Sequence, residues 1–239
     1  MSLRPVETYR QKPRMNVRER LFSTYCLDFD GVTAAQRVSV PNFNLAAPYT
    51  LLQWVWPRAY RLAIWRKSLG APWLFYGVRT APDRQLLYDK SGAFYTAVAA
   101  FTPPLNRWSL VGIRANSPTS FNFVLNGVPS IVYAPAAGDI EDNVAPMYIG
   151  YNSFYLALWN GYIDEFFHAP IALSDAELME VFYRGYARRM TGSLLNLRME
   201  AGTGLIAFDT SGAGNNGTLV NNPTWTRVAK YALLTESGV

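Results

Sequence analysis

The segment from Asp209 to Leu219 carries the residues best suited to bind a metal ion. Asp209, Asn215 and Asn216 supply a carboxylate and two amide oxygens within one stretch rich in glycine. Calcium prefers such hard oxygen ligands, at about 2.3–2.6 Å. The sequence therefore predicts calcium as a cofactor, with Asp164 as a further ligand from an adjoining hairpin. The alternative is that these side chains only satisfy backbone groups of a turn.

Candidates for catalysis are few. A single histidine, His168, and a single cysteine, Cys26, exclude a multi-histidine metal centre, an internal disulfide and a cysteine-based metal site. The adjacent acids Asp164–Glu165 and Glu141–Asp142 would point to opposite faces of a strand. The glycine-rich segment lacks the Lys-Ser/Thr that follows in a phosphate-binding loop. We therefore predict no catalytic residues and a protein that is not an enzyme.

An aromatic segment between two predicted strands is the best candidate for sugar binding. It contributes Tyr151, Asn152, Phe154 and Tyr155, which would form a platform in a loop. The alternative is that large aromatic side chains mostly fill the core of a sandwich.

The basic charge of the chain is concentrated at its N-terminus. Residues 1–20 carry a net charge of +4, out of +5 for all 239 residues. We interpret residues 1–21 as an arm that docks on a neighbouring subunit, although a solvated tail without a partner is the simpler reading. A basic stripe with interleaved aromatic residues is missing from the body, so we expect no nucleic-acid specificity. The basic residues of this assembly arm are Arg4, Arg10, Lys12, Arg14, Arg18 and Arg20.

The rest of the chain has the sequence pattern of an all-β protein. Only 16% of all 239 residues are charged and 15% are aromatic, and short apolar runs alternate with Gly, Pro and Asn-Gly turn signals. A capping box at Ser174–Glu177, followed by Gly185, predicts one helix near 175–184. No apolar run approaches the roughly 20 residues that span a bilayer, and the N-terminal residues lack the apolar region of a secretory signal.

Four groups of residues, in order along the chain, resemble the motifs of the laminin-G-like, concanavalin A-like lectin/glucanase superfamily. They are the Phe-Asp-Gly hairpin at 27–41, the apolar strand at 49–55, the strand pair at 108–113 and 123–127, and the Gly-x-Ile-Asp-Glu and Ala-Leu-Ser-x-x-Glu motifs within 147–177. The resemblance implies an antiparallel β-sandwich of the jelly-roll, concanavalin A-like type over residues 22–228, with one short helix and a tail at 229–239. It also implies calcium near the loops, as in related domains.

The sequence departs from the family pattern in two places. A segment like Asp209–Leu219, followed by Pro-Thr-Trp, usually precedes the Phe-Asp-Gly hairpin, whereas here it follows the helix. This order indicates a circular permutation, which a sandwich with adjacent termini tolerates, or else a truncated second repeat. The glucanase branches use Glu-x-Asp-x-x-Glu, and no glutamate here has Asp two and Glu five residues later.

These features favour a non-enzymatic structural or adhesion module of a larger assembly, such as a viral capsid-decoration or tail component. Its partners would be neighbouring protein subunits, it would be oligomeric, and it would reside in a virion or an extracellular surface assembly. The second interpretation is a glycan-binding lectin domain, and the third is a glycoside hydrolase with an unrecognised site.

Overall fold

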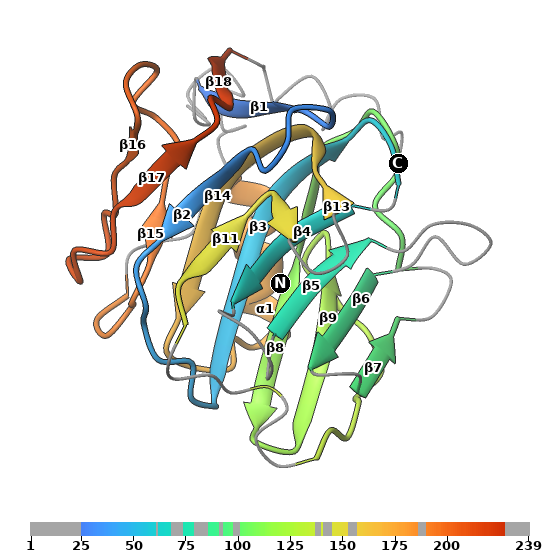
Figure 1. Cartoon of the computed structure of the whole chain (residues 1–239). Helices are drawn as coiled ribbons and strands as arrows, with labels where there is room; N and C mark the ends of the chain where they lie inside the picture. Colours follow the sequence, from blue (N-terminus) through green and yellow to red (C-terminus); the bar gives the residue numbers. More distant parts are fainter. Residues whose placement is uncertain are drawn as a thin grey trace, which may run out of the picture.

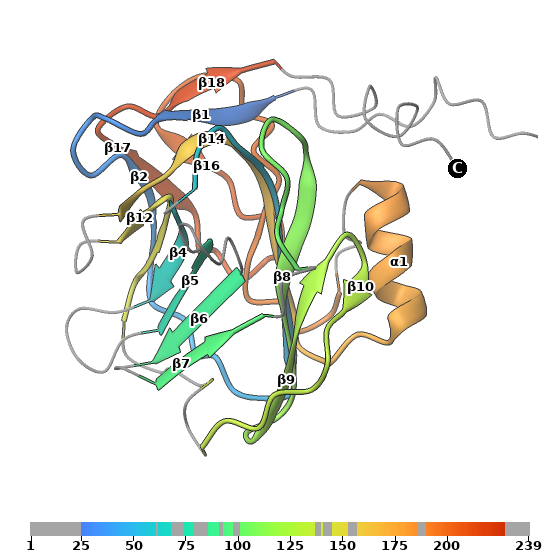
Figure 2. The same ribbon diagram turned by 90° about the vertical axis from the view of Figure 1, so that its right-hand side faces the viewer.

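Two antiparallel β-sheets stack face to face in the computed structural model of the chain, with a helix behind one of them (Figures 1 and 2). The structure describes residues 25–60, 62–67, 74–78, 86–90, 93–97, 101–136, 140, 145–152, 157–185 and 190–227. For residues 62, 74–78, 86–90, 93 and 94 it describes the backbone alone.

Sheet A is the layer next to the helix. Its strands in spatial order are β10 (Val128–Pro129), β9 (Ser120–Leu125), β8 (Ser109–Ser117), β3 (Tyr49–Pro57), β14 (Asn160–Ala169), β1 (Cys26–Asp30) and β18 (Thr224–Thr226). Strand β15 (Asn196–Leu197) pairs with the later part of β14, beyond the residues that pair with β1.

Sheet B is the layer in front in Figure 1. Its strands in spatial order are β16 (Ile206–Ala207), β17 (Gly217–Val220), β2 (Arg37–Val40), β11 (Met147–Ile149), β4 (Leu62–Lys67), β5 (Leu74–Val78), β6 (Leu86–Lys90) and β7 (Ala93–Thr96). A separate hairpin of β12 (Tyr151–Asn152) and β13 (Ala157–Leu158) follows β11 and contacts β4.

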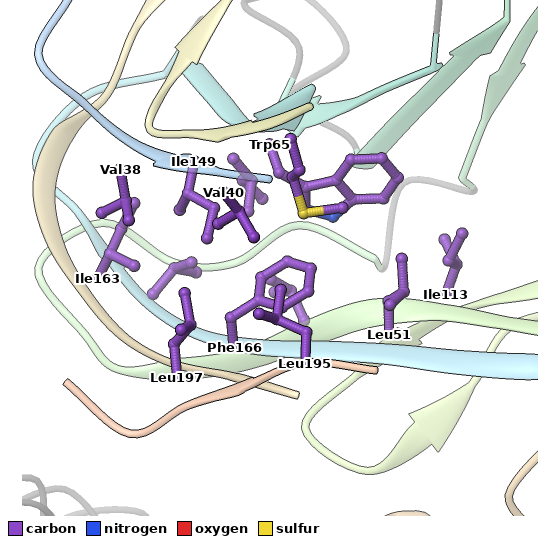
Figure 3. Close-up of a cluster of buried hydrophobic side chains, with 14 of the residues drawn as sticks. Val38, Val40, Leu51, Trp65, Ile113, Ile149, Ile163, Phe166, Leu195 and Leu197 are labelled. Atoms are coloured by element: carbon purple, nitrogen blue, oxygen red, sulfur yellow. The ribbon is translucent and has the colours of Figure 1, made fainter. Parts of the chain in front are cut away.

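The main core fills the space between the sheets because strand residues alternate between two faces. Val38 and Val40 of β2 and Ile149 of β11 are fully buried and face Ile163 and Phe166 of β14 (Figure 3). Burying each such side chain contributes roughly 1.5–3 kcal/mol. The inward residues of sheet B therefore lie in the core, and their neighbours in the sequence must point outward.

A second apolar cluster lies on the opposite face of sheet A. There α1 (Asp175–Arg184) places Leu178 and Phe182 against Trp54 and Leu52 of β3. Both faces of β3 are therefore covered, which explains why its sequence is apolar along nearly its whole length.

The predicted fold class is confirmed, since the structure is an antiparallel concanavalin A-like sandwich and α1 is the single helix in its described part. The helix begins and ends as its sequence indicates: Ser174 and Glu177 form the reciprocal capping box, and Gly185 has a φ of 75°. Asn126 and Gly127 both have positive φ, as a two-residue hairpin turn requires.

The C-terminal strands belong to the same two sheets as the rest of the chain. Strand β17 pairs with β2, and β18 pairs with β1 through Cys26–Thr226, Leu27–Trp225 and Asp28–Thr224. Because β1 and β18 are antiparallel, the first and last described residues lie side by side, and Arg227 donates a hydrogen bond to the Tyr25 hydroxyl at 2.6 Å. The glycine-rich segment thus takes part in the sandwich instead of opening a second unit.

Candidate functional site

The outer face of sheet B is defined by the residues that alternate with the core. On β2, Arg37 and Ser39 point away from the buried Val38 and Val40, and on β11 Tyr148 lies between the buried Met147 and Ile149. Tyr148 pairs with Ser39 on one side and with Arg66 of β4 on the other, and Ser39 pairs with the exposed Thr218. A row of Thr218, Ser39, Tyr148 and Arg66 therefore crosses four adjacent strands.

Arg37 and two tyrosines form a cluster on this face, which we call the Arg37 platform. The guanidinium carbon of Arg37 lies 5.1 Å from the ring centroid of Tyr148 and 5.8 Å from that of Tyr151. Its Nη1 donates a hydrogen bond to the carbonyl of Ala35 at 3.0 Å. All three residues of the platform are partly buried, so the cation is held between aromatic rings at the surface.

The predicted glycan-binding residues have separate places in this arrangement. Tyr151 belongs to the Arg37 platform, whereas Asn152 is fully buried and its amide oxygen accepts a hydrogen bond from Arg66 Nη1 at 3.3 Å. Asn152 thus fastens the β12–β13 hairpin to sheet B. Phe154 and Tyr155 lie outside the described residues.

Sequence reasoning missed Arg37 and Tyr148, although a signal for both was available. Arg-Val-Ser-Val and Met-Tyr-Ile alternate strictly, which marks Arg37, Ser39 and Tyr148 as outward-facing on two strands. The sequence does not indicate that these two strands are neighbours, since they are more than 100 residues apart.

The predicted calcium loop is held together by hydrogen bonds to Asp209. Its Oδ1 accepts from the backbone N–H groups of Asn196 and Ser211, both at 2.9 Å. Its Oδ2 accepts from Ser211 Oγ at 2.8 Å and from the N–H of Asn215 at 2.9 Å. The carboxylate of Asp209 thus joins β15 to two points of its own loop.

The other predicted calcium ligands are also engaged within the protein. Asn216 Oδ1 accepts from the backbone N–H of Asp209 at 2.8 Å, and Asn215 Nδ2 donates to the carbonyl of Leu194 at 2.7 Å. Asp164 lies in β14, two strands away from Asp209 across β15, and its Oδ1 accepts from the N–H of Glu165 at 2.7 Å.

This donor set fits a loop-closing carboxylate better than a calcium ligand. N–H and O–H donors point their hydrogen atoms at both carboxylate oxygens of Asp209, at the positions that a cation would take. Among the described residues, no group of three or more His, Cys, Asp and Glu side chains could hold a metal ion. Calcium binding at Asp209 stays a prediction from the sequence.

The remaining candidates for chemistry lie inside the protein. Asp164 and Glu165 are 0% and 4% exposed, and a β-bulge at Glu165, with a φ of 37°, interrupts the pairing of β14 with β3. His168 is also buried, its Nδ1 accepts a hydrogen bond from the N–H of Leu194 at 3.2 Å, and burial lowers its pKa to about 4. Glu141 and Asp142 lie outside the described residues, as do the basic residues of the predicted arm.

A sequence profile described as the concanavalin A-like lectin/glucanases superfamily matches residues 30–179 of the chain. A search of curated proteins found no match. None of the helices in the described ranges is long and apolar enough to cross a membrane.

Solved structures of low sequence identity share the fold. A Bacteroides ovatus ATCC 8483 protein to which carbohydrate binding is ascribed has a TM-score of 0.64 and 14% identity, over 87% of this chain and 61% of its own. The heptameric SAP-like pentraxin of Limulus polyphemus has a TM-score of 0.62 and 11% identity, over 88% of this chain and 98% of its own. Tailspike protein 2 of an Escherichia coli bacteriophage has a TM-score of 0.50 and 11% identity, over 82% of this chain and 31% of its own. The chain thus spans less than two thirds of the Bacteroides protein and about a third of the tailspike.

Proposed function

The chain belongs to the concanavalin A-like lectin/glucanases superfamily, and on that premise we propose that it is a non-catalytic carbohydrate-binding module whose site is the Arg37 platform. The observation that carries this proposal is the pair of tyrosine rings, Tyr148 and Tyr151, that Arg37 holds in place on the outer face of sheet B. Sugar sites combine such apolar faces with a few fixed polar groups. Ser39 and Thr218 supply hydroxyls in the same row as Tyr148.

Two further observations support this proposal. The Bacteroides ovatus protein with the same fold has carbohydrate binding ascribed to it. The adjacent acids Asp164 and Glu165 are buried in β14, where they do not offer the two open carboxylates that flank a bond in a glycosidase. The second observation supports the non-catalytic part of the proposal.

The test is a glycan array probed with the wild type, Tyr148→Ala and Tyr151→Ala. We expect the wild type to retain particular saccharides, with competition by the free sugar, and each variant to lose at least tenfold in affinity. Tyr183→Ala is the matched control, because Tyr183 is exposed on α1, behind sheet A. Binding by the wild type that survives both platform substitutions would place the site elsewhere, and no binding to any saccharide would overturn the proposal.

A second candidate function is that of a module within a larger assembly, such as a virion component. It is favoured by apolar side chains exposed at the outermost strand of each sheet. Val128, Ile131 and Val132 lie along β10 and the residues after it, whereas Leu205 and Phe208 flank β16. Edge strands in a monomer usually carry charges or are covered, so two apolar edges are typical of contact with neighbouring chains.

The native mass of the chain at micromolar concentration tests this second candidate. Association is expected, and Val132→Lys together with Phe208→Lys should reduce it at least tenfold. The matched control is Val32→Lys, since Val32 is 81% exposed and lies in the loop between β1 and β2, outside β10, β16 and the residues that flank them. A monomeric wild type, or association that the double variant leaves unchanged, would contradict an edge-mediated assembly.

A further inference from the structure

Arg37 keeps most of its hydrogen-bonding capacity unused. A guanidinium carries five N–H donors, and one of those of Arg37 donates to the carbonyl of Ala35. Its Nε is buried and has no hydrogen-bond partner, and none of the ion pairs within the described residues includes Arg37. Among the described residues, no carboxylate therefore balances this partly buried cation.

The surroundings of Arg37 reinforce this positive character. Strands β17, β2 and β11 contain no Asp or Glu, so these three strands place no acid beside the platform. Arg66 brings a second guanidinium to the same face on β4, where Tyr148 pairs with it. The segment 153–156, which joins β12 to β13, reads Ser-Phe-Tyr-Leu and carries no charge.

We propose that the Arg37 platform binds saccharides that carry a carboxylate, such as those containing a uronic acid, and that Arg37 pairs with that carboxylate. This inference rests on the proposed carbohydrate-binding function. The planar fork of arginine matches a carboxylate with two parallel hydrogen bonds, and such charge-assisted bonds are roughly twice as strong as neutral ones. The tyrosine rings fix the guanidinium in advance, so that little side-chain freedom remains to be lost on binding.

Calorimetry with matched pairs of saccharides tests the inference. Each pair is an acidic oligosaccharide that contains uronic acid and its carboxyl-reduced, neutral counterpart, which keeps the same linkages and hydroxyls. The wild type should bind the acidic member of at least one pair at least tenfold more tightly, and this preference should shrink as the salt concentration rises.

Arg37→Gln should abolish the preference for the acidic member and should also weaken binding of the neutral member, because Arg37 holds the tyrosine rings, whereas Arg37→Lys should retain part of the preference. Arg184→Gln is the control, because Arg184 is also a surface arginine but lies on α1, where it forms an ion pair with Glu180. If Arg37→Gln fails to fold, as thermal melting would reveal, the salt dependence and the acidic-to-neutral ratio of the wild type decide alone.

The outcomes separate this inference from the function on which it rests. Equal binding of the acidic and neutral members, unchanged by salt and by Arg37→Gln, would overturn the inference and leave a carbohydrate-binding module. Absence of binding to either member of every pair would overturn the inference, whereas absence of binding to every saccharide of the glycan array would overturn both.

Discussion

His168 is the residue whose burial has the clearest effect on the molecule. Its ring stacks on Tyr49 with centroids 6.2 Å apart, and its Nδ1 is occupied by the N–H of Leu194 at 3.2 Å. A proton on Nδ1 would break that hydrogen bond and place a charge among aromatic rings. The neutral ring is therefore part of the contact between β14 and the segment that leads into β15.

The lowered pKa of His168 predicts a loss of stability in mild acid. Because the pKa falls from 6.5 to about 4 on folding, the stabilising effect is complete above pH 6.5 and is lost as the pH falls toward 4. The loss amounts to about 3 kcal/mol, at about 1.4 kcal/mol for each pH unit. Urea denaturation at several pH values measures it, and His168→Gln should show a flatter profile between pH 6.5 and 4.5. Parallel profiles for the two proteins would contradict this role.

Asp209 is expected to stabilise its loop without a metal. In Asp209→Asn, an amide N–H₂ would face donors that now find carboxylate oxygens, so one or two hydrogen bonds would be lost. We expect a loss of about 1–3 kcal/mol, equal in calcium and in chelator. Thermal melting under both conditions measures it. A wild-type melting temperature that rises with calcium, and a variant that shows no rise, would support the calcium prediction instead.

At the scale of residues, the sequence predicts the position of a side chain only where that position depends on the spacing of nearby residues. Tyr151 was predicted as part of a sugar platform and does lie beside Arg37, but Asn152 turns inward because the hairpin folds over β4. The contact between Arg37 and Tyr148 depends on the register of β2 with β11, which is set by distant residues.

At the scale of elements, α1 depends on a cap that can be removed by one substitution. Ser174 Oγ accepts from the N–H of Glu177 at 3.3 Å, while Glu177 Oε2 accepts from the N–H of Ser174 at 2.7 Å. Glu177 Oε2 also accepts from Ser174 Oγ at 2.7 Å, and the hydroxyl first and the N–H second lower the pKa of Glu177. Ser174→Ala should cost about 1 kcal/mol of unfolding free energy.

The stability of Ser174→Ala is measured by chemical denaturation, with Thr203→Ala as a control for removal of an exposed loop hydroxyl. The helix covers Trp54 and Leu52, so loosening it should also make the fluorescence of Trp54 more accessible to a soluble quencher. An unchanged midpoint would show that packing on sheet A, and not the cap, fixes the start of α1.

Elements with strong local signals were predictable, and elements without them were not. The helix at 175–184 and the Asn126-Gly127 turn follow from capping and turn chemistry within a few residues. The β12–β13 hairpin has strands of two residues each, which are too short to show an alternating apolar pattern in the sequence. The hairpin depends on its contacts with β4, which lies beneath it.

At the scale of the whole molecule, the predicted arm is testable although it lies outside the described residues. Deleting residues 1–20 should leave the sandwich folded, since its described strands begin at Cys26. If the arm docks on a neighbour, the deletion should weaken association of the chain, and the loss should depend on salt because six of the removed residues are basic.

Sedimentation at several salt concentrations measures association, and thermal melting measures the fold. Replacing residues 1–20 with a neutral Gly-Ser segment of equal length controls for bulk. A lower melting temperature with unchanged association would show that the arm packs on its own domain.

The pairing of β1 with β18 also determines how the molecule would respond to mechanical load. Residues 25 and 227 sit at the same corner, so tension applied through them pulls the three paired positions apart one after another. This is a peeling geometry, in which each step breaks few bonds, unlike shear, which loads a whole ladder at once. A pull on both ends should therefore strip β18 from sheet A at low force, before the core between the sheets is disturbed.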